Sequence, residues 1–149
     1  MKITLDWQEQ LHFTARANEH TVALDAQPPL GKDRGMTPKA MLLSALAGCT
    51  AMDVAALMNK HRQPLESLSI EAEGTVSSGG HPKVFSAARL VFVAQGAIDP
   101  KLLCEAVEAS QTRYCGVSAM LSRAFPIEYT ILLNGQQIGA GRAAFPVTD

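Results

Sequence analysis

The fold is decided by one stretch of the chain, residues 37–60, which reads TPKAMLLSALAGCTAMDVAALMNK. It opens with Thr37-Pro38, where a threonine can cap a helix and a proline at the first helical position loses no hydrogen bond. The helix that this start predicts would be about 35 Å long and apolar on nearly every side. Such a helix has to be covered all round. We therefore expect a sheet on one side of it and a second layer, such as another subunit, on the other.

The segments on either side of this helix predict strands. Upstream, residues 3–24 alternate apolar and polar side chains in three short runs, which predicts an antiparallel meander with one buried face. Downstream, residues 68–76 and 84–94 predict two strands joined by a hairpin loop. A last strand is expected at residues 127–133, before the tight-turn pair Asn134-Gly135.

Two shorter helices are expected between these strands. Asp99-Pro100 repeats the cap-plus-proline signal, and a third helix is predicted at about residues 115–123. The order of elements predicts an α+β fold, which we expect to form a single domain over residues 1–149. From about residue 139 the chain is small and irregular, which predicts a loose tail.

Composition excludes several classes of function. Hydrophobic residues make up 47% and charged residues 18%, values typical of a globular protein. The formal net charge is −1 and aromatic residues are 5%, so we expect neither a nucleic-acid nor a membrane partner. The most apolar run, residues 41–58, contains Asp53 and is interpreted as a core helix, not a membrane span. Asp6 and Glu9 leave no room for a signal peptide, and with three cysteines this predicts the reducing cytoplasm.

The cysteines are the residues best suited to chemistry. Cys49 lies mid-helix after Gly48, which costs roughly 1 kcal/mol there relative to alanine and suggests that another group approaches the backbone. Cys115 lies at a predicted helix N-terminus, where unpaired amides favour a thiolate. Each can also be a small buried core residue, and Cys104 is interpreted as incidental. None of the four histidines has zinc-like spacing to a cysteine, so we expect no metal, and no motif indicates a cofactor.

Two segments are familiar together. Residues 36–54 read MTPKAMLLSALAGCTAMDV, and residues 108–117 read EASQTRYCGV. The first resembles the central-helix signature of the OsmC/Ohr family of thiol-dependent hydroperoxidases, and the second resembles the segment with that family's second cysteine. The order of elements agrees from about Ile3 to Leu133. The closer resemblance is to the YhfA-like branch, which also carries Gly-Cys-Ser/Thr-Ala-x-Asp.

The resemblance implies both an assembly and a reaction. The assembly is an intertwined homodimer in which antiparallel sheets from both chains wrap two long central helices. The reaction is reduction of an organic hydroperoxide by Cys49, which becomes a sulfenic acid that Cys115 resolves as a disulfide. A dithiol reductant then regenerates the thiols. This chemistry needs an apolar pocket for the organic group, for which we expect a lining from Met41, Leu42, Leu46, Met52 and Met120.

The chain departs from the family pattern after the proline that opens the central helix. Members typically carry a glutamate there, paired with an arginine that contacts the reactive cysteine, whereas this sequence has Lys39. Arg16 and Arg34 are the candidates for the arginine. Asp53 lies one helical turn after Cys49, where its charge would oppose a thiolate. We expect Asp53 to have a partner, such as Arg34 or Arg123, or to form an ion pair at the dimer interface.

Three functions are compatible with these residues. The first is a thiol peroxidase of the family type. The second is a non-catalytic OsmC-like module that binds a small molecule, which the missing glutamate at Lys39 favours. The third is a hotdog-type thioesterase, because that fold also wraps a long apolar helix with a sheet. The two cysteines and the divided late helices count against the third.

Overall fold

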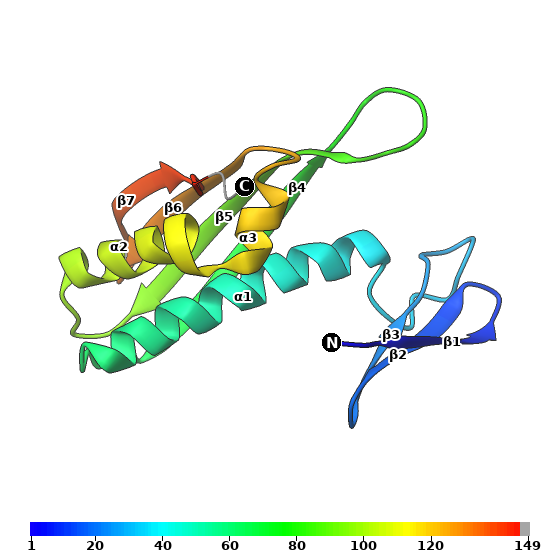
Figure 1. Cartoon of the computed structure of the whole chain (residues 1–149), viewed down its shortest axis with the longest axis horizontal. Helices are drawn as coiled ribbons and strands as arrows, with labels where there is room; N and C mark the ends of the chain where they lie inside the picture. Colours follow the sequence, from blue (N-terminus) through cyan, green and yellow to red (C-terminus); the bar gives the residue numbers. More distant parts are fainter. Residues whose placement is uncertain (147–149) are drawn as a thin grey trace. The chain divides into compact units, whose positions relative to one another are not determined.

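The computed structural model describes residues 1–146 and divides the chain into two units, Met1–Leu42 and Leu43–Asp149 (Figure 1). The N-terminal unit contains three strands and the start of a long helix. The C-terminal unit contains the rest of that helix, four strands and the later helices. Two sheets and a long helix confirm the predicted α+β class. The single domain over the whole chain stays a prediction.

The N-terminal unit is the predicted meander. Strands β1 (Thr4–Glu9), β2 (His12–Ala17) and β3 (His20–Leu24) pair antiparallel in the order β1-β2-β3. The alternation predicted that one face of the meander is buried, and this prediction is wrong for the chain by itself. Large apolar side chains of the meander are exposed: Ile3, Leu5, Trp7, Leu11 and Val22. A three-stranded sheet with no second layer in its own unit cannot bury one face.

Helix α1 (Pro38–Lys60) has the predicted start and end. The amide of Ala40 donates to Oγ1 of Thr37 over 3.3 Å, which confirms the threonine cap. One stripe of the helix is buried, at residues four apart: Leu46, Thr50, Val54 and Met58. Met52, on another side, is 75% exposed. The chain thus covers only part of the apolar surface that the sequence predicted would be covered all round.

Helix α1 would also suit a membrane span by its length and composition. The expectation that the protein has no membrane partner therefore stays a prediction.

The sheet of the C-terminal unit has the order β4-β5-β6-β7. Its first strands, β4 (Ser67–Val76) and β5 (Phe85–Gln95), form the predicted hairpin. Strand β6 (Ile127–Leu133) pairs with β5 in parallel, which departs from the antiparallel expectation. The reason is the long connection between them, because a parallel pair requires a crossover and here the crossover carries the later helices.

That crossover contains three helical segments. Helix α2 (Pro100–Ala109) has Asp99 as its cap, whose side chain accepts from the amide of Lys101 over 2.8 Å, as predicted. A π-helical turn, η1 (Ser110–Tyr114), joins the two predicted helices, and α3 (Gly116–Leu121) follows with Cys115 as its cap.

The apolar core of the C-terminal unit lies between one face of the sheet and the helices (Figure 1). Alternate residues of β5, such as Leu90 and Phe92, are buried beside their β6 partners Tyr129 and Ile131. On the helix side the core is completed by residues of α1 and α2, including Val54, Leu103 and Val107.

The loose tail expected from about residue 139 is wrong for the described part of that segment. Residues 136–142 form strand β7 (Gln136–Arg142), which pairs antiparallel with β6 after the turn at Asn134 and Gly135. The glycines of β7 allow neighbouring side chains to pack closely against the strand. A Cβ on Gly141 would lie 2.5 Å from Oη of Tyr129, and one on Gly139 3.1 Å from Sγ of Cys104. Residues 147–149 lie outside the described part.

Candidate functional site

Two cysteines from distant parts of the sequence meet in the C-terminal unit. Cys49 lies in the middle of α1, and Cys115 caps α3. The Sγ atoms of Cys49 and Cys115 and a carboxylate oxygen of Asp53 all lie within 4.8 Å of one another. We call these three residues the thiol-carboxylate cluster. The predicted meeting of Cys49, Cys115 and Asp53 is therefore present in the structure, with all cysteines as free thiols.

A chain of hydrogen bonds joins α1 to η1 beside the cluster. The Ser110 hydroxyl donates to Oδ2 of Asp53 over 2.9 Å, so Asp53 has a serine as a partner, where the sequence suggested an arginine or an interface ion pair. Oγ of Ser110 lies 2.7 Å from Oγ1 of Thr50, and Nε2 of Gln111 donates to that Oγ1 over 2.8 Å.

The direction of this chain follows from the number of protons. A hydroxyl has one proton to donate. Ser110 uses its proton on Asp53, so Thr50 must donate to Ser110 and in turn accepts from Gln111. Every donor thus points toward the carboxylate. Such a chain holds the Asp53 carboxyl in a fixed position beside the two thiols.

Cys115 is fully buried, whereas Cys49 is partly exposed. Burial raises the pKa of the Cys115 thiol to about 11, and Cys49 adds to the increase, while hydrogen bonding by Ser118 opposes it. The amide of Ser118 donates to Sγ of Cys115 over 3.3 Å. The thiolate character predicted for Cys115 from its helix terminus is therefore wrong, because desolvation outweighs one amide of a six-residue helix.

Gly48 does not have the close neighbour that its position suggested. Within residues 1–146, and apart from its chain neighbours and the adjacent helix backbone, nothing lies within 4 Å of a Cβ built on Gly48, and the same holds for Gly116. Gly48 therefore marks an open part of the helix surface and not a close approach.

Cys104 lies apart from the thiol-carboxylate cluster, as predicted, and is partly buried. Its Sγ lies 3.7 Å from the carbonyl oxygen of Ile138 in β7 and packs against the apolar core. Burial, with a smaller contribution from the charge of Glu108, raises the pKa of its thiol. Cys104 thus has a packing role between α2 and β7.

The two arginine candidates lie in the N-terminal unit, and both have carboxylate partners there. Nε of Arg16 lies 3.2 Å from Oδ2 of Asp6. Arg34 contacts Asp25 through Nε at 3.3 Å and Glu9 through Nη1 at 2.6 Å. A role for Arg16 or Arg34 beside a cysteine stays a prediction.

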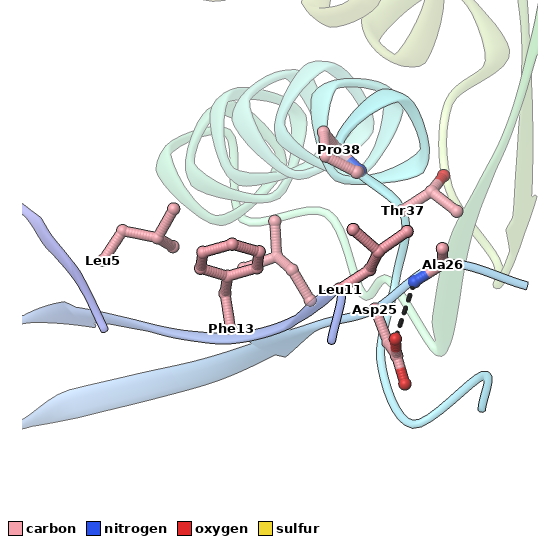
Figure 2. A pocket seen from close by; sticks show the side chains of 8 residues that line it. Leu5, Leu11, Phe13, Asp25, Ala26, Thr37 and Pro38 are labelled. Atoms are coloured by element: carbon pink, nitrogen blue, oxygen red, sulfur yellow. Dashed lines mark hydrogen bonds between the residues drawn. The ribbon is translucent and has the colours of Figure 1, made fainter. Parts of the chain in front are cut away.

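This chain by itself does not form the apolar pocket lining that was expected near Cys49. Leu46 is part of the core, whereas Leu42, Met52 and Met120 are exposed in this chain. The N-terminal unit instead contains an apolar cavity of about 390 Å³ (Figure 2). Figure 2 shows Leu5, Phe13 and Leu11 projecting from the strand side toward Pro38 at the start of the helix.

Four polar residues of the site were missed by the sequence analysis: Thr50, Ser110, Gln111 and Ser118. All four are fully buried. One signal could have found two of them, since the polar pair Ser110 and Gln111 directly follows the apolar stripe of α2 and lies shortly before Cys115. Buried oxygens without a partner in the described part of the chain are Oε1 of Gln111 and Oγ of Ser118.

Known proteins are similar to this chain in sequence and in fold. Protein YhfA of Escherichia coli K12 is 27% identical over 132 residues, which are 87% of this chain and 96% of YhfA. An OsmC-like protein from Mycoplasma pneumoniae has 20% identity and a TM-score of 0.77, covering 89% of this chain and 95% of that one.

A more distant structure carries a functional name. The organic hydroperoxide resistance protein OsmC from Legionella pneumophila has a TM-score of 0.60 at 13% identity, over 89% of this chain and 94% of that one. Residues 31–130 match the sequence profile of the OsmC-like proteins, and that segment includes both cysteines of the cluster. The chain belongs to the OsmC-like protein family.

Proposed function

We propose that this protein reduces organic hydroperoxides, with Cys49 as the peroxide-reactive thiol and Cys115 as the resolving thiol. The observation that carries the proposal is the thiol-carboxylate cluster, whose two sulfur atoms and one carboxylate oxygen lie within 4.8 Å of one another. The family supports a redox role, and the Legionella pneumophila neighbour is named for hydroperoxide resistance.

The first step oxidises Cys49. Its sulfur attacks the terminal oxygen of the hydroperoxide, the O–O bond breaks, and an S–O bond forms. The products are a sulfenic acid and an alcohol, whose oxygen takes up the proton that Cys49 has lost. Cys49 suits this step better than Cys115, because it is partly exposed and Cys115 stays protonated at neutral pH with its pKa at about 11.

The second step forms the disulfide. The sulfur of Cys115 attacks that of Cys49, and the sulfenic hydroxyl leaves as water with the proton of Cys115. The sum is one hydroperoxide and two thiols converted to one alcohol, one water and one disulfide. A dithiol reductant then restores both thiols by exchange. No cofactor takes part in this scheme, and a reducing cytoplasm would supply the reductant.

Asp53 is proposed to move the protons in both steps. The family's glutamate is replaced by Lys39, so another group has to serve. The carboxylate of Asp53 lies within 4.8 Å of both sulfur atoms, and its hydrogen bond from Ser110 holds it in place. It can accept a thiol proton and return it to the leaving oxygen, which is general acid–base catalysis.

The homodimer is proposed for the same protein. Exposed apolar side chains on α1, such as Leu42 and Met52, and on the N-terminal meander, such as Trp7, favour a second copy as their cover. A covered α1 would also supply the apolar surroundings that reward binding of an organic group, at about 25 cal/mol per Å² of buried surface.

The non-catalytic binding module remains the second candidate. The apolar cavity of about 390 Å³ in the N-terminal unit favours it, because small-molecule sites are concave and mostly apolar. The family match argues against the hotdog-type thioesterase.

Thiol counting after peroxide addition tests the proposal. A Cys104→Ser protein, reduced and then given one equivalent of cumene hydroperoxide, is expected to lose two thiols and form the Cys49–Cys115 disulfide. Cys115→Ser is expected to accumulate sulfenic acid at Cys49, and Cys49→Ser is expected to keep its thiols. Hydrogen peroxide should react more slowly than cumene hydroperoxide. If all thiols stay free, or if the native sequence forms a Cys49–Cys104 disulfide, the non-catalytic binding module becomes the better-supported function.

The role of Asp53 is tested on the first step alone. Asp53→Asn is expected to slow sulfenic acid formation roughly 100-fold, the lower end of the usual contribution of acid–base catalysis. Glu108→Gln, which removes a carboxylate from α2, is the matched control. A faster reaction in Asp53→Asn would mean that the carboxylate opposes the thiolate instead of assisting it.

A further inference from the structure

The reduced thiol-carboxylate cluster offers a set of ligands that the peroxide reaction does not use as such. Two sulfur atoms and one carboxylate oxygen converge from α1 and from the cap of α3. We propose that these three residues bind one thiophilic d¹⁰ cation of the Zn²⁺ or Cd²⁺ class when the protein is reduced. The inference uses the site of the proposed function but does not require that function, because cation binding involves no peroxide.

The spacing of the three atoms fits such a cation. A tetrahedral zinc with Zn–S bonds of about 2.3 Å holds two sulfur atoms about 3.8 Å apart. In the structure, the sulfur atoms of Cys49 and Cys115 and an oxygen of Asp53 lie within 4.8 Å of one another. Small side-chain rotations would bring them to bonding distance, because Cys49 and Asp53 lie one turn apart on the same side of α1.

The kind of donor selects the kind of metal. Thiolates favour zinc, cadmium and copper(I), whereas magnesium and calcium prefer sites made wholly of oxygen. Three protein ligands leave the fourth position of a tetrahedron open to water or to a small ligand. Cys49 is partly exposed, so such a ligand can reach the cluster from the side of this cysteine.

The groups around the cluster are arranged to support bound ligands. Ser110 donates to Asp53 and fixes its carboxylate, as outer residues do around metal sites. The amide of Ser118 donates to Sγ of Cys115, and the hydroxyl of the same residue is fully buried with no partner within residues 1–146. A metal-bound thiolate accepts hydrogen bonds better than a thiol, so metal binding would strengthen the hydrogen bonding from Ser118 to this sulfur.

Binding has a consequence for redox chemistry. Two thiols lose their protons when the cation binds, and no electron is transferred. The same sulfur atoms cannot both hold the cation and share a disulfide. The bound cation and the oxidised state therefore exclude each other.

Cadmium titration of the reduced protein tests the inference. The Cys104→Ser protein is reduced, treated with a chelator, desalted, and titrated with CdCl₂ without peroxide. We expect a thiolate-to-cadmium absorption band that saturates at one equivalent per chain, and Zn²⁺ should remove it by competition. Cys49→Ser and Cys115→Ser should each lose the band. Asp53→Asn should bind at least about tenfold more weakly, and Glu108→Gln should bind as before.

Several outcomes would overturn the inference: no band, a band that survives in either folded variant, Cys49→Ser or Cys115→Ser, or unchanged affinity in Asp53→Asn. Circular dichroism of each variant shows whether it is folded, and Cys49→Ser, at a half-buried position, provides the test if Cys115→Ser does not fold. Cumene hydroperoxide added first separates the two proposals. If the reduced protein binds cadmium, and the peroxide-treated protein has oxidised thiols and binds none, both proposals are supported. If cadmium still binds after peroxide and no thiol is oxidised, only the cation site is supported. If peroxide oxidises the thiols but the reduced protein binds no cadmium, only the peroxidase is supported.

Discussion

The two units of this chain are stabilised in opposite ways. The C-terminal unit has a closed apolar core, in which Leu90 and Phe92 of β5 are fully buried. Among residues 1–42, all of which are described, the one buried side chain is a charged one, Asp25. The apolar side chains of that unit, such as Leu5 and Trp7, are exposed.

In the N-terminal unit, hydrogen bonds to the buried carboxylate of Asp25 have the stabilising role that the apolar core has in the C-terminal unit. Its Oδ1 accepts from the amide of Ala26 at 2.8 Å, and its Oδ2 accepts from the amides of Lys32 and Arg34, each at 3.2 Å. The loop wraps so closely that a Cβ on Gly31 would lie 2.5 Å from Oδ1 of Asp25. The C-terminal unit is therefore stabilised by apolar packing. The N-terminal unit is ordered by local hydrogen bonds, and its exposed apolar side chains are free to pack against another surface.

The largest expected difference between the units is in how much a leucine-to-alanine change lowers the free energy of unfolding. Leu90→Ala should lower the free energy of unfolding by about 2–5 kcal/mol, because Leu90 is 0% exposed. Leu5→Ala, at a leucine that is 55% exposed, should cost less than about 1 kcal/mol at low protein concentration. Urea unfolding followed by circular dichroism measures both. Equal costs would contradict the comparison, and a Leu5→Ala cost that rises with protein concentration would show a second copy covering the meander.

The next effect concerns the uncovered apolar surface of α1. We expect the chain to sediment as a dimer at micromolar concentration and Met52→Glu to weaken association at least about tenfold, because an unpaired charge would be buried. Asn59→Glu, at an exposed polar position of α1, is the matched control. A compact and stable monomer at low micromolar concentration, measured by analytical ultracentrifugation, would refute this prediction.

A smaller effect is expected from pH in the N-terminal unit. Burial acts to raise the pKa of Asp25, but the hydrogen bonds from Arg34 and from the amides of Ala26 and Lys32 outweigh it and lower that pKa. A lowered carboxyl pKa stabilises the folded state above the unfolded value of about 4, and this stabilisation is lost as the pH falls through the folded value. Asp25→Asn should therefore unfold at a lower temperature than the native chain at pH 7.

The pH series also provides the control. The difference in melting temperature between Asp25→Asn and the native chain should shrink as the pH falls below about 4, since the native carboxyl is then protonated too. Asp33→Asn, at an exposed loop position, should show no such trend. A difference that grows on acidification would contradict the assigned direction.

The smallest effect is expected where α1 begins. The first turn of α1 has no acidic residue, and Lys39 there is exposed. Lys39→Glu should raise stability by about 0.3–1 kcal/mol, because a negative charge is favourable near a helix N-terminus. Lys60→Glu makes the same change of charge in the last turn and should have the opposite sign. A marked loss of folding in Lys39→Glu would show that Lys39 has a structural partner.

Much of the fold could be predicted because its signals are local. The threonine cap and proline define the start of α1, and period-two alternation identifies β4, β5 and β6. Strand β7 was missed because its glycines have no pattern of their own. Their small size has a meaning only beside Tyr129 and Cys104, which are close in space.

The same distinction between local sequence signals and contacts made in space applies to the candidate site. The sequence by itself determined which residues are the candidates for chemistry, Cys49, Cys115 and Asp53, since residue type and family resemblance are present in the chain as written. Only the tertiary structure decided their state, because desolvation and hydrogen bonding depend on groups far away along the chain. Cys115 is a buried thiol with a raised pKa instead of a thiolate, and Asp53 is held by Ser110, which lies 57 positions away in the sequence.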